Sequence, residues 1–180
     1  MAYNTGERSV PELLRDWGAI MRELRTLGIV RTNNNPVGDI AEAIVAEHFH
    51  GTRGSFAQAG WDVKAGKDLI QVKALRQVPG TKRRNLSPIR DADYSCVVIV
   101  IFDEDFTVVE GLRLKRDLVE QLFVHRPYVN GRIITVTQRL RDHPEVEHLD
   151  LADAARRVGA SGHGALAPPS TLSPPATGDK

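Results

Sequence analysis

The chain has 180 residues, of which 41% are hydrophobic and 26% are charged, and its formal net charge is +1. These proportions are ordinary for a globular protein and exclude a fibrous, membrane-embedded or wholly disordered chain. A single domain is expected at this length. The first residues lack the apolar run of a secretory signal, and no segment is long enough to span a bilayer, so we expect a cytoplasmic protein without membrane attachment.

The first predicted element is an amphipathic helix that ends before Gly28. Ser9 and Glu12 have the spacing of a capping box, and apolar residues recur at helical intervals after them. These apolar residues are Leu13, Leu14, Trp17, Ile20, Met21, Leu24 and Leu27. We expect residues 1–33 to form an N-terminal accessory helix that packs on the core.

A second helix is expected to begin at Asn35 and Pro36, a capping side chain followed by proline in the first turn, and to run to about Phe49 before Gly51. Its apolar stripe consists of Val37, Ile40, Ala41, Ile44, Val45 and Phe49. At about 100° per residue, Glu42 falls beside Phe49 on the flank of this stripe. A carboxylate in that position can reach over the edge of a neighbouring sheet.

Two short strands follow, near residues 61–64 and 69–75, joined by a tight turn in which Gly66 supplies a positive φ. With Gly66 and Lys67 as the loop, Asp62 falls opposite Gln71. Because side chains alternate along a strand, Gln71 and Lys73 share one face. The hairpin therefore gathers Asp62, Gln71 and Lys73 at one place in the sheet.

The remaining elements complete an α/β fold with a central mixed β-sheet flanked by helices. We expect an apolar strand covered on both faces, its hairpin partner, a helix and a further strand, at residues 94–102, 106–114, 115–123 and 132–137. A last short helix is expected from Asp150. From residue 159 the chain is rich in Gly, Ala, Pro, Ser and Thr, so we expect 159–180 to be a disordered tail and 34–158 to be the main domain.

The gathered residues suit phosphodiester hydrolysis. A hard cation such as Mg²⁺, with Mn²⁺ as an alternative, takes oxygen ligands, and the Asp62 carboxylate, the Gln71 amide oxygen and the Val72 carbonyl offer them. The Lys73 ammonium is suited to hold an attacking water and to offset charge at phosphorus.

Glu42 is the fourth expected member of the site. It is predicted to bind a second metal ion or a water in the shell of the first. Asp39, about one turn earlier and on the side expected to be more exposed, is a weaker candidate for the same task.

At these residues the sequence resembles the PD-(D/E)XK, or restriction-endonuclease-like, superfamily, through Glu42 in GDIAEAIVAEHF, Asp62 in GWDV and Gln71 with Lys73 in IQVKAL. Glutamine replaces the more usual acidic residue, as in the similar Mrr-like branch of restriction enzymes, and Trp61 stands where the family name has proline. The resemblance implies a restriction-endonuclease-like fold and a magnesium-dependent deoxyribonuclease, most simply in restriction or defence against foreign DNA.

Six cations with no intervening acidic residue stand between residues 73 and 90: Lys73, Arg76, Lys82, Arg83, Arg84 and Arg90. All but Lys73 are candidates for contact with DNA phosphates. A solvated loop is the simpler interpretation of the same stripe. With little room for a specificity domain, the chain is expected to act as a homodimer, with partner subunits, or with low selectivity.

Other interpretations remain open at this point. Asp62 and Lys73 could form an ordinary cross-strand ion pair. The fold could serve a repair or recombination nuclease that acts on structured DNA, or a nucleic-acid-binding module that has lost turnover, for which the neutral Gln71 is the internal hint. A zinc site at His48 and His50 is disfavoured because cysteine partners are missing.

Overall fold

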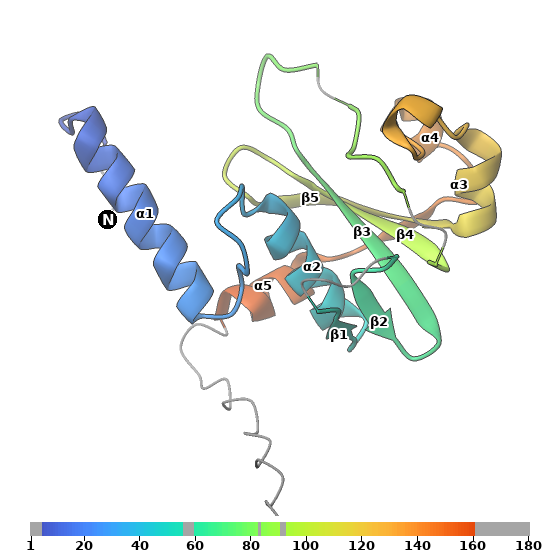
Figure 1. Cartoon of the computed structure of the whole chain (residues 1–180), viewed down its shortest axis with the longest axis horizontal. Coiled ribbons are helices and arrows are strands. Elements are labelled where there is room, and N and C mark those ends of the chain that lie inside the picture. The colour runs from blue at the N-terminus through green and yellow to red at the C-terminus, as the bar shows by residue number, and fades with distance from the viewer. Residues whose placement is uncertain (1–4, 56–59, 83, 91–92, 161–180) are drawn as a thin grey trace, which may run out of the picture.

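The computed structural model describes residues 5–55, 60–82, 84–90 and 93–160. Six strands form one mixed sheet in the order β1-β2-β3-β4-β5-β6, with helices against both faces (Figure 1). The strands are β1 Thr52–Arg53, β2 Val63–Ala65, β3 Asp68–Arg76, β4 Cys96–Phe102, β5 Val108–Lys115 and β6 Glu147–Leu149. The helices are α1 Val10–Thr26, α2 Val37–His48, α3 Arg116–Leu122, α4 Gln138–Arg141 and α5 Ala152–Ala160, and a 3-10 turn covers Pro127–Val129.

The centre of the sheet is β4, all seven residues of which are buried. It runs parallel to β3 and antiparallel to β5, and the other neighbouring pairs are also antiparallel. The continuous apolar run of this strand is explained by cover on both faces, since a half-exposed strand would alternate. This confirms the predicted central strand, its hairpin partner β5 and the mixed α/β architecture.

Two hydrophobic clusters lie on opposite faces of the sheet. On one face, α2 and α5 pack over a cluster that includes Ile44, Ile70 and Val98. On the other face, α3 and α4 supply Leu118 and Leu140 to a second cluster. The side chains of β3 alternate between these faces, so the position of each β3 residue in the sequence decides which face it reaches.

The segment 132–137 is not a strand of the sheet, so this prediction was wrong. Its backbone pairs with the loop after β3, through bridges of Asn85 with Thr135 and of Ile89 with Arg132. Ile134 is buried over the α3 face of the sheet. β-branched residues favour an extended backbone but do not specify its partner. The sheet instead gains β1 and β6 at its edges, which are too short to leave a periodic pattern.

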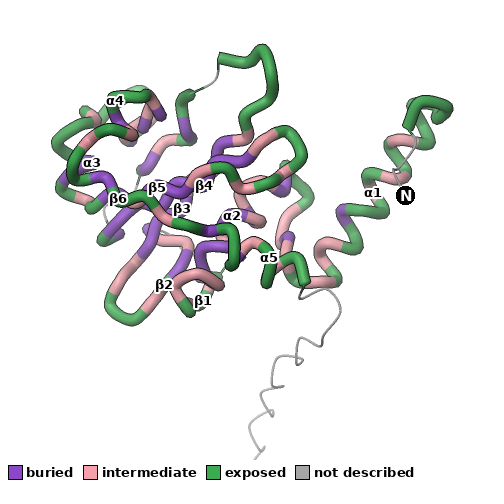
Figure 2. Tube along the Cα trace, turned by 180° about the vertical axis from the view of Figure 1, so that it is seen from behind, coloured by how far each residue is buried: buried purple, intermediate pink, exposed green. Residues whose placement is uncertain are grey.

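The first helix forms with the expected capping box, in which the Ser9 amide donates to Glu12 Oε2 at 2.8 Å. It does not lie on the core as expected, and Figure 1 shows it extending away from the sheet. Figure 2 shows its surface largely exposed or intermediate. At the other end of the chain, α5 continues to Ala160, and the rest of the expected tail lies outside the described residues.

Candidate active site

The β2–β3 hairpin has the predicted register. Val63 pairs with Ile70 and Ala65 with Asp68, around a turn in which Gly66 has φ 58°. One step further along, the Asp62 amide donates to the Ile70 carbonyl at 2.8 Å, so Asp62 stands beside Gln71. The left-handed backbone at Gly66 is accessible to glycine without steric strain, which explains why the turn is made there.

The Asp62 carboxylate closes the hairpin ladder. Its Oδ2 accepts a hydrogen bond from the Val72 amide at 2.7 Å and another from the Gln71 side-chain amide. Because β2 begins only at Val63, the Val72 amide takes the side chain of Asp62 as its acceptor. The N–H and C=O of a strand residue point to the same side. The Val72 carbonyl therefore faces the same edge of β3 as the carboxylate.

Gln71 and Lys73 share one face of β3, as predicted. They pair in register with Val97 and Ile99 of β4, whose side chains belong to the α3-face cluster. Gln71 is only 9% exposed, and Lys73 is partly buried. The site therefore lies on the α3 face, beside the start of β2 and at the edge of β3.

Glu42 approaches the site from α2, on the opposite side of the sheet. Burial, and after it the negative charge of Asp62, raise the pKa of Glu42 to about 7, against the opposing effect of Arg31 and Arg53. The influence of Asp62 indicates that the two carboxylates are electrostatic neighbours. Glu42 forms an ion pair with Arg31 Nη2, and its Oε2 lies 3.8 Å from Arg53 Nε.

Asp39 is not on an exposed side, and that prediction was wrong. It is 8% exposed. Its Oδ2 accepts from the Arg31 amide at 3.1 Å and the Thr32 amide at 3.2 Å, and its Oδ1 lies 3.4 Å from Arg53 Nη2. Asp39 thus holds the linker between α1 and α2, and its acceptor capacity serves that role.

Sequence reasoning missed the two arginines at the site. Arg31 donates to the Gly54 carbonyl at 2.6 Å, and Arg53 donates to the carbonyls of Gly28 and Ile29 at 3.0 and 3.2 Å. They tie the linker after α1 to the segment that leads into β2. Neither residue belongs to a periodic pattern or a motif, so no sequence signal pointed to them.

The oxygen atoms around Asp62 are of the type that a hard cation prefers, but few of them carry a negative charge. Among the described residues, no group of three or more His, Cys, Asp or Glu side chains is arranged to hold a metal ion. Asp62 and Glu42 supply two carboxylates, and Gln71 and Val72 add neutral oxygens. To present its oxygen, the Gln71 amide must turn over, because its nitrogen faces Asp62 here.

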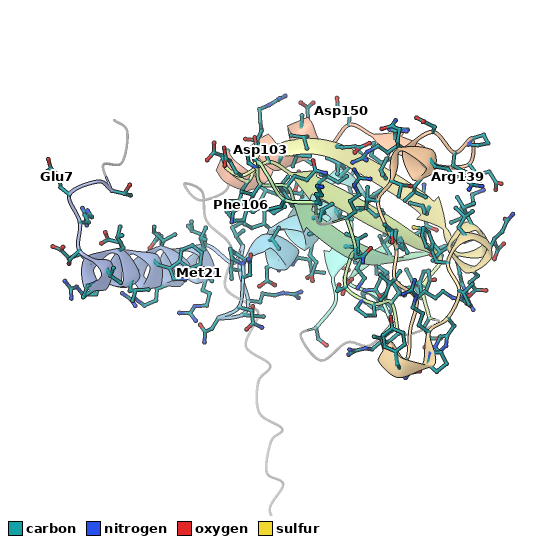
Figure 3. The ribbon with its side chains drawn as sticks, turned by 90° about the horizontal axis from the view of Figure 1, so that it is seen from above. Glu7, Met21, Asp103, Phe106, Arg139 and Asp150 are labelled. Atoms are coloured by element: carbon teal, nitrogen blue, oxygen red, sulfur yellow. The ribbon has the colours of Figure 1, made fainter. Side chains whose placement is uncertain are left out.

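The basic stripe divides into residues with different surroundings. Arg76 donates through Nε and Nη2 to the Glu104 carbonyl at 3.1 and 2.7 Å, and its guanidinium lies 4.4 Å from the Phe106 ring centroid. Arg76 therefore anchors the β4–β5 turn. This differs from the expectation that its side chain contacts DNA phosphates. Figure 3 shows Phe106 beside Asp103 in that turn.

The other cations of the stripe lie on the surface. Lys82, Arg84 and Arg90 are exposed, whereas Arg83 lies outside the described residues. Lys82 and Arg84 line a cavity of about 670 Å³. The same cavity is also lined by the acidic residues Asp103, Glu104 and Asp105 of the β4–β5 turn. Anions that approach these two cations therefore also meet negative charge.

The chain matches no protein-family model, and no curated protein is similar enough to count as a relative. A mixed α/β sheet flanked by helices supports many unrelated activities. Within the part of the chain that the structure describes, no helix is long and apolar enough to cross a membrane. The geometry around Asp62 is therefore the main basis for a functional proposal.

Proposed function

We propose that this chain is a magnesium-dependent nuclease that hydrolyses DNA phosphodiester bonds, on a fold of the restriction-endonuclease-like kind. One observation carries the proposal. The Asp62 carboxylate meets the Gln71 amide and the backbone of Val72 at the edge of β3, on the strand face that Lys73 shares.

Asp62, the carbonyl of Val72, the turned amide of Gln71 and Glu42 would hold the cation. Bound there, Mg²⁺ or Mn²⁺ would polarise the phosphate and lower the pKa of a ligated water. Because Gln71 is neutral, Glu42 would supply more of the electrostatic attraction for the ion than it would if position 71 were also a carboxylate. For Glu42 to hold an ion, Arg31 would have to give up part of its contact with that carboxylate.

The protein groups then divide the remaining work. Lys73 places a positive charge next to the reacting phosphate, holds the attacking water by hydrogen bonding and offsets the developing negative charge. In the metal-free protein, Glu42 has a pKa near 7, which suits proton exchange with water at neutral pH. The exposed Lys82, Arg84 and Arg90 attract the DNA backbone toward this face.

Restriction or defence against foreign DNA, as a homodimer or with partner subunits, is the setting we propose. Cleavage of linear duplex in preference to a four-way junction supports it. The opposite preference favours a repair or recombination nuclease. The ion pair between Arg31 and Glu42 favours one other candidate, a nucleic-acid-binding module of the same fold without turnover.

Plasmid cleavage in Mg²⁺ tests the proposal. We expect nicking by the wild type, its loss in Asp62→Ala and Lys73→Ala, and its retention in Lys64→Ala, which removes an exposed lysine from β2. EDTA should abolish the activity. DNA binding without nicking by the wild type would support the binding module, and equal nicking by all four proteins would eliminate the site.

A further inference from the structure

The most conspicuous feature that the proposed site does not use is the face of α1. The helix has seventeen residues and runs outward from the domain. Figure 3 shows Glu7 beyond its far end and Met21 closer to the domain. Packing of an apolar face supplies most helix stability in proteins. Such a helix is expected to have a partner.

The apolar residues of α1 and its C-terminal end follow a heptad repeat. With Val10 at position a, the a positions are Val10, Trp17 and Leu24, and the d positions are Leu13, Ile20 and Leu27. Alternating spacings of three and four residues are the pattern of a two-stranded coiled-coil seam. The pattern covers the whole helix.

Much of this seam is exposed. Val10 is 68%, Trp17 47% and Ile20 47% exposed, and Leu14, which flanks the seam, is 65% exposed. Met21 is the one buried residue of the helix. A row of large apolar side chains on a projecting helix is a typical contact surface.

The charges of α1 select the kind of partner. Three arginines, Arg15, Arg22 and Arg25, balance three acidic residues, Glu12, Asp16 and Glu23, so the helix is neutral. Helices that bind membrane surfaces are instead rich in Lys and Arg on their polar face. A neutral helix with a heptad seam suits another copy of the same helix.

The flanking charges also select an orientation. Asp16 and Glu23 occupy the g positions beside the seam, while Leu14 and Met21 occupy the e positions. In an antiparallel pair, g positions face g positions, so Asp16 would meet Glu23 of the partner subunit. In a parallel pair, g positions face e positions, and this like-charge contact is avoided.

We propose that α1 pairs in parallel with α1 of a second copy of this chain, forming a short two-stranded coiled coil that makes the protein a homodimer. The pairing covers the exposed seam and places both domains at the same end of the coil. It does not depend on the proposed nuclease activity.

The size of the seam sets the strength of the dimer. A helix of seventeen residues is about 25 Å long at ~1.5 Å per residue. A contact along one such helix is smaller than the roughly 800 Å² per partner of a standard interface. We therefore expect association in the micromolar range and a clear concentration dependence.

Sedimentation velocity between about 1 and 200 µM, without metal or DNA, tests the proposal. We expect reversible dimers of the wild type and at least a tenfold weaker association of Trp17→Glu. Ala19→Glu, an exposed substitution outside the seam, should behave as the wild type. Urea unfolding of the domain should be the same for both variants, because α1 projects from the sheet.

Disulfide trapping tests the orientation. In a parallel pair, two Val10→Cys chains bring their sulfurs together and should cross-link on oxidation. In an antiparallel pair, Val10 lies near Leu27 of the partner subunit, and only mixtures of Val10→Cys with Leu27→Cys should cross-link. The native Cys96 is buried and serves as the background control. A wild type that stays monomeric at 200 µM, or equal association of Trp17→Glu and Ala19→Glu, would overturn the proposal.

Discussion

The contact between Gln71 and Asp62 makes the replacement Gln71→Glu informative. The native amide donates to Asp62 Oδ2, and its residue is only 9% exposed. The variant replaces this donor with a second carboxyl group at hydrogen-bond distance. Two unit negative charges 4 Å apart repel by about 4 kcal/mol at an effective dielectric constant of ~20, and a raised pKa relieves part of that repulsion.

We expect the metal-free variant to lose about 2–3 kcal/mol of unfolding free energy at pH 8, corresponding to a pKa rise of about two units in the carboxyl pair. The introduced pair has a higher pKa when folded than when unfolded, so its penalty is absent near pH 4 and grows as the pH rises toward 7. Saturating Mg²⁺ should offset the loss, because a cation relieves the repulsion between the carboxylates.

A matched pair elsewhere in the chain provides the control. Gln138 Nε2 donates to Asp142 Oδ1 at 2.8 Å, and both residues are exposed. Because solvent screens this pair, Gln138→Glu should change stability by less than about 1 kcal/mol and should not respond to Mg²⁺. Urea unfolding with EDTA and with Mg²⁺ measures the loss of unfolding free energy in both variants. Equal losses in the two variants, or a loss at Gln71 that Mg²⁺ leaves unchanged, would refute the reasoning.

Three further predictions concern neighbouring groups. Because burial and the charge of Asp62 raise the pKa of Glu42 from 4.5 to about 7, the wild type in EDTA should lose about 3 kcal/mol relative to Glu42→Gln as the pH rises through this interval, measured by urea unfolding. A constant difference would contradict the shift. Arg76→Ala should lower the unfolding free energy by about 1–3 kcal/mol, since Arg76 anchors a turn. Lys82→Ala and Arg84→Ala should leave stability unchanged and each reduce the salt slope of DNA binding by about one. A loss of stability in Arg84→Ala, together with an unchanged stability in Arg76→Ala, would contradict these two assignments.

The hairpin could be predicted because its determinants are local. A two-residue turn with Gly66 fixes the register, and alternation along β3 fixes the faces of Gln71 and Lys73. Asp62 follows from the same register. These features depend on residues close together in the chain.

The surroundings of Glu42 could not be predicted in the same way. Arg31 and Arg53 reach it from segments with no periodic pattern. Asp39 was assigned to the wrong side of α2 because its burial comes from the linker that folds over it. A helical wheel locates a residue relative to its own helix only. It does not indicate which irregular segment will cover that residue.

The same limit applies to packing partners. The amphipathic pattern of α1 predicted a helix, and the helix forms, but its apolar face does not cover this domain. Residues 132–137 are extended as their β-branched content indicates, yet they pair with a loop in place of the sheet. Amphipathic patterns predict that a face will be buried, and the partner follows from the tertiary fold or from another chain.

Mn²⁺ binding followed by electron paramagnetic resonance, without DNA, tests most directly whether Asp62, Gln71 and Glu42 share a cation. We predict a binding event in the wild type that weakens at least tenfold in Asp62→Ala and is unchanged in Asp105→Ala, an exposed acidic residue of the β4–β5 turn. Binding of equal strength in all three proteins would contradict the proposed site.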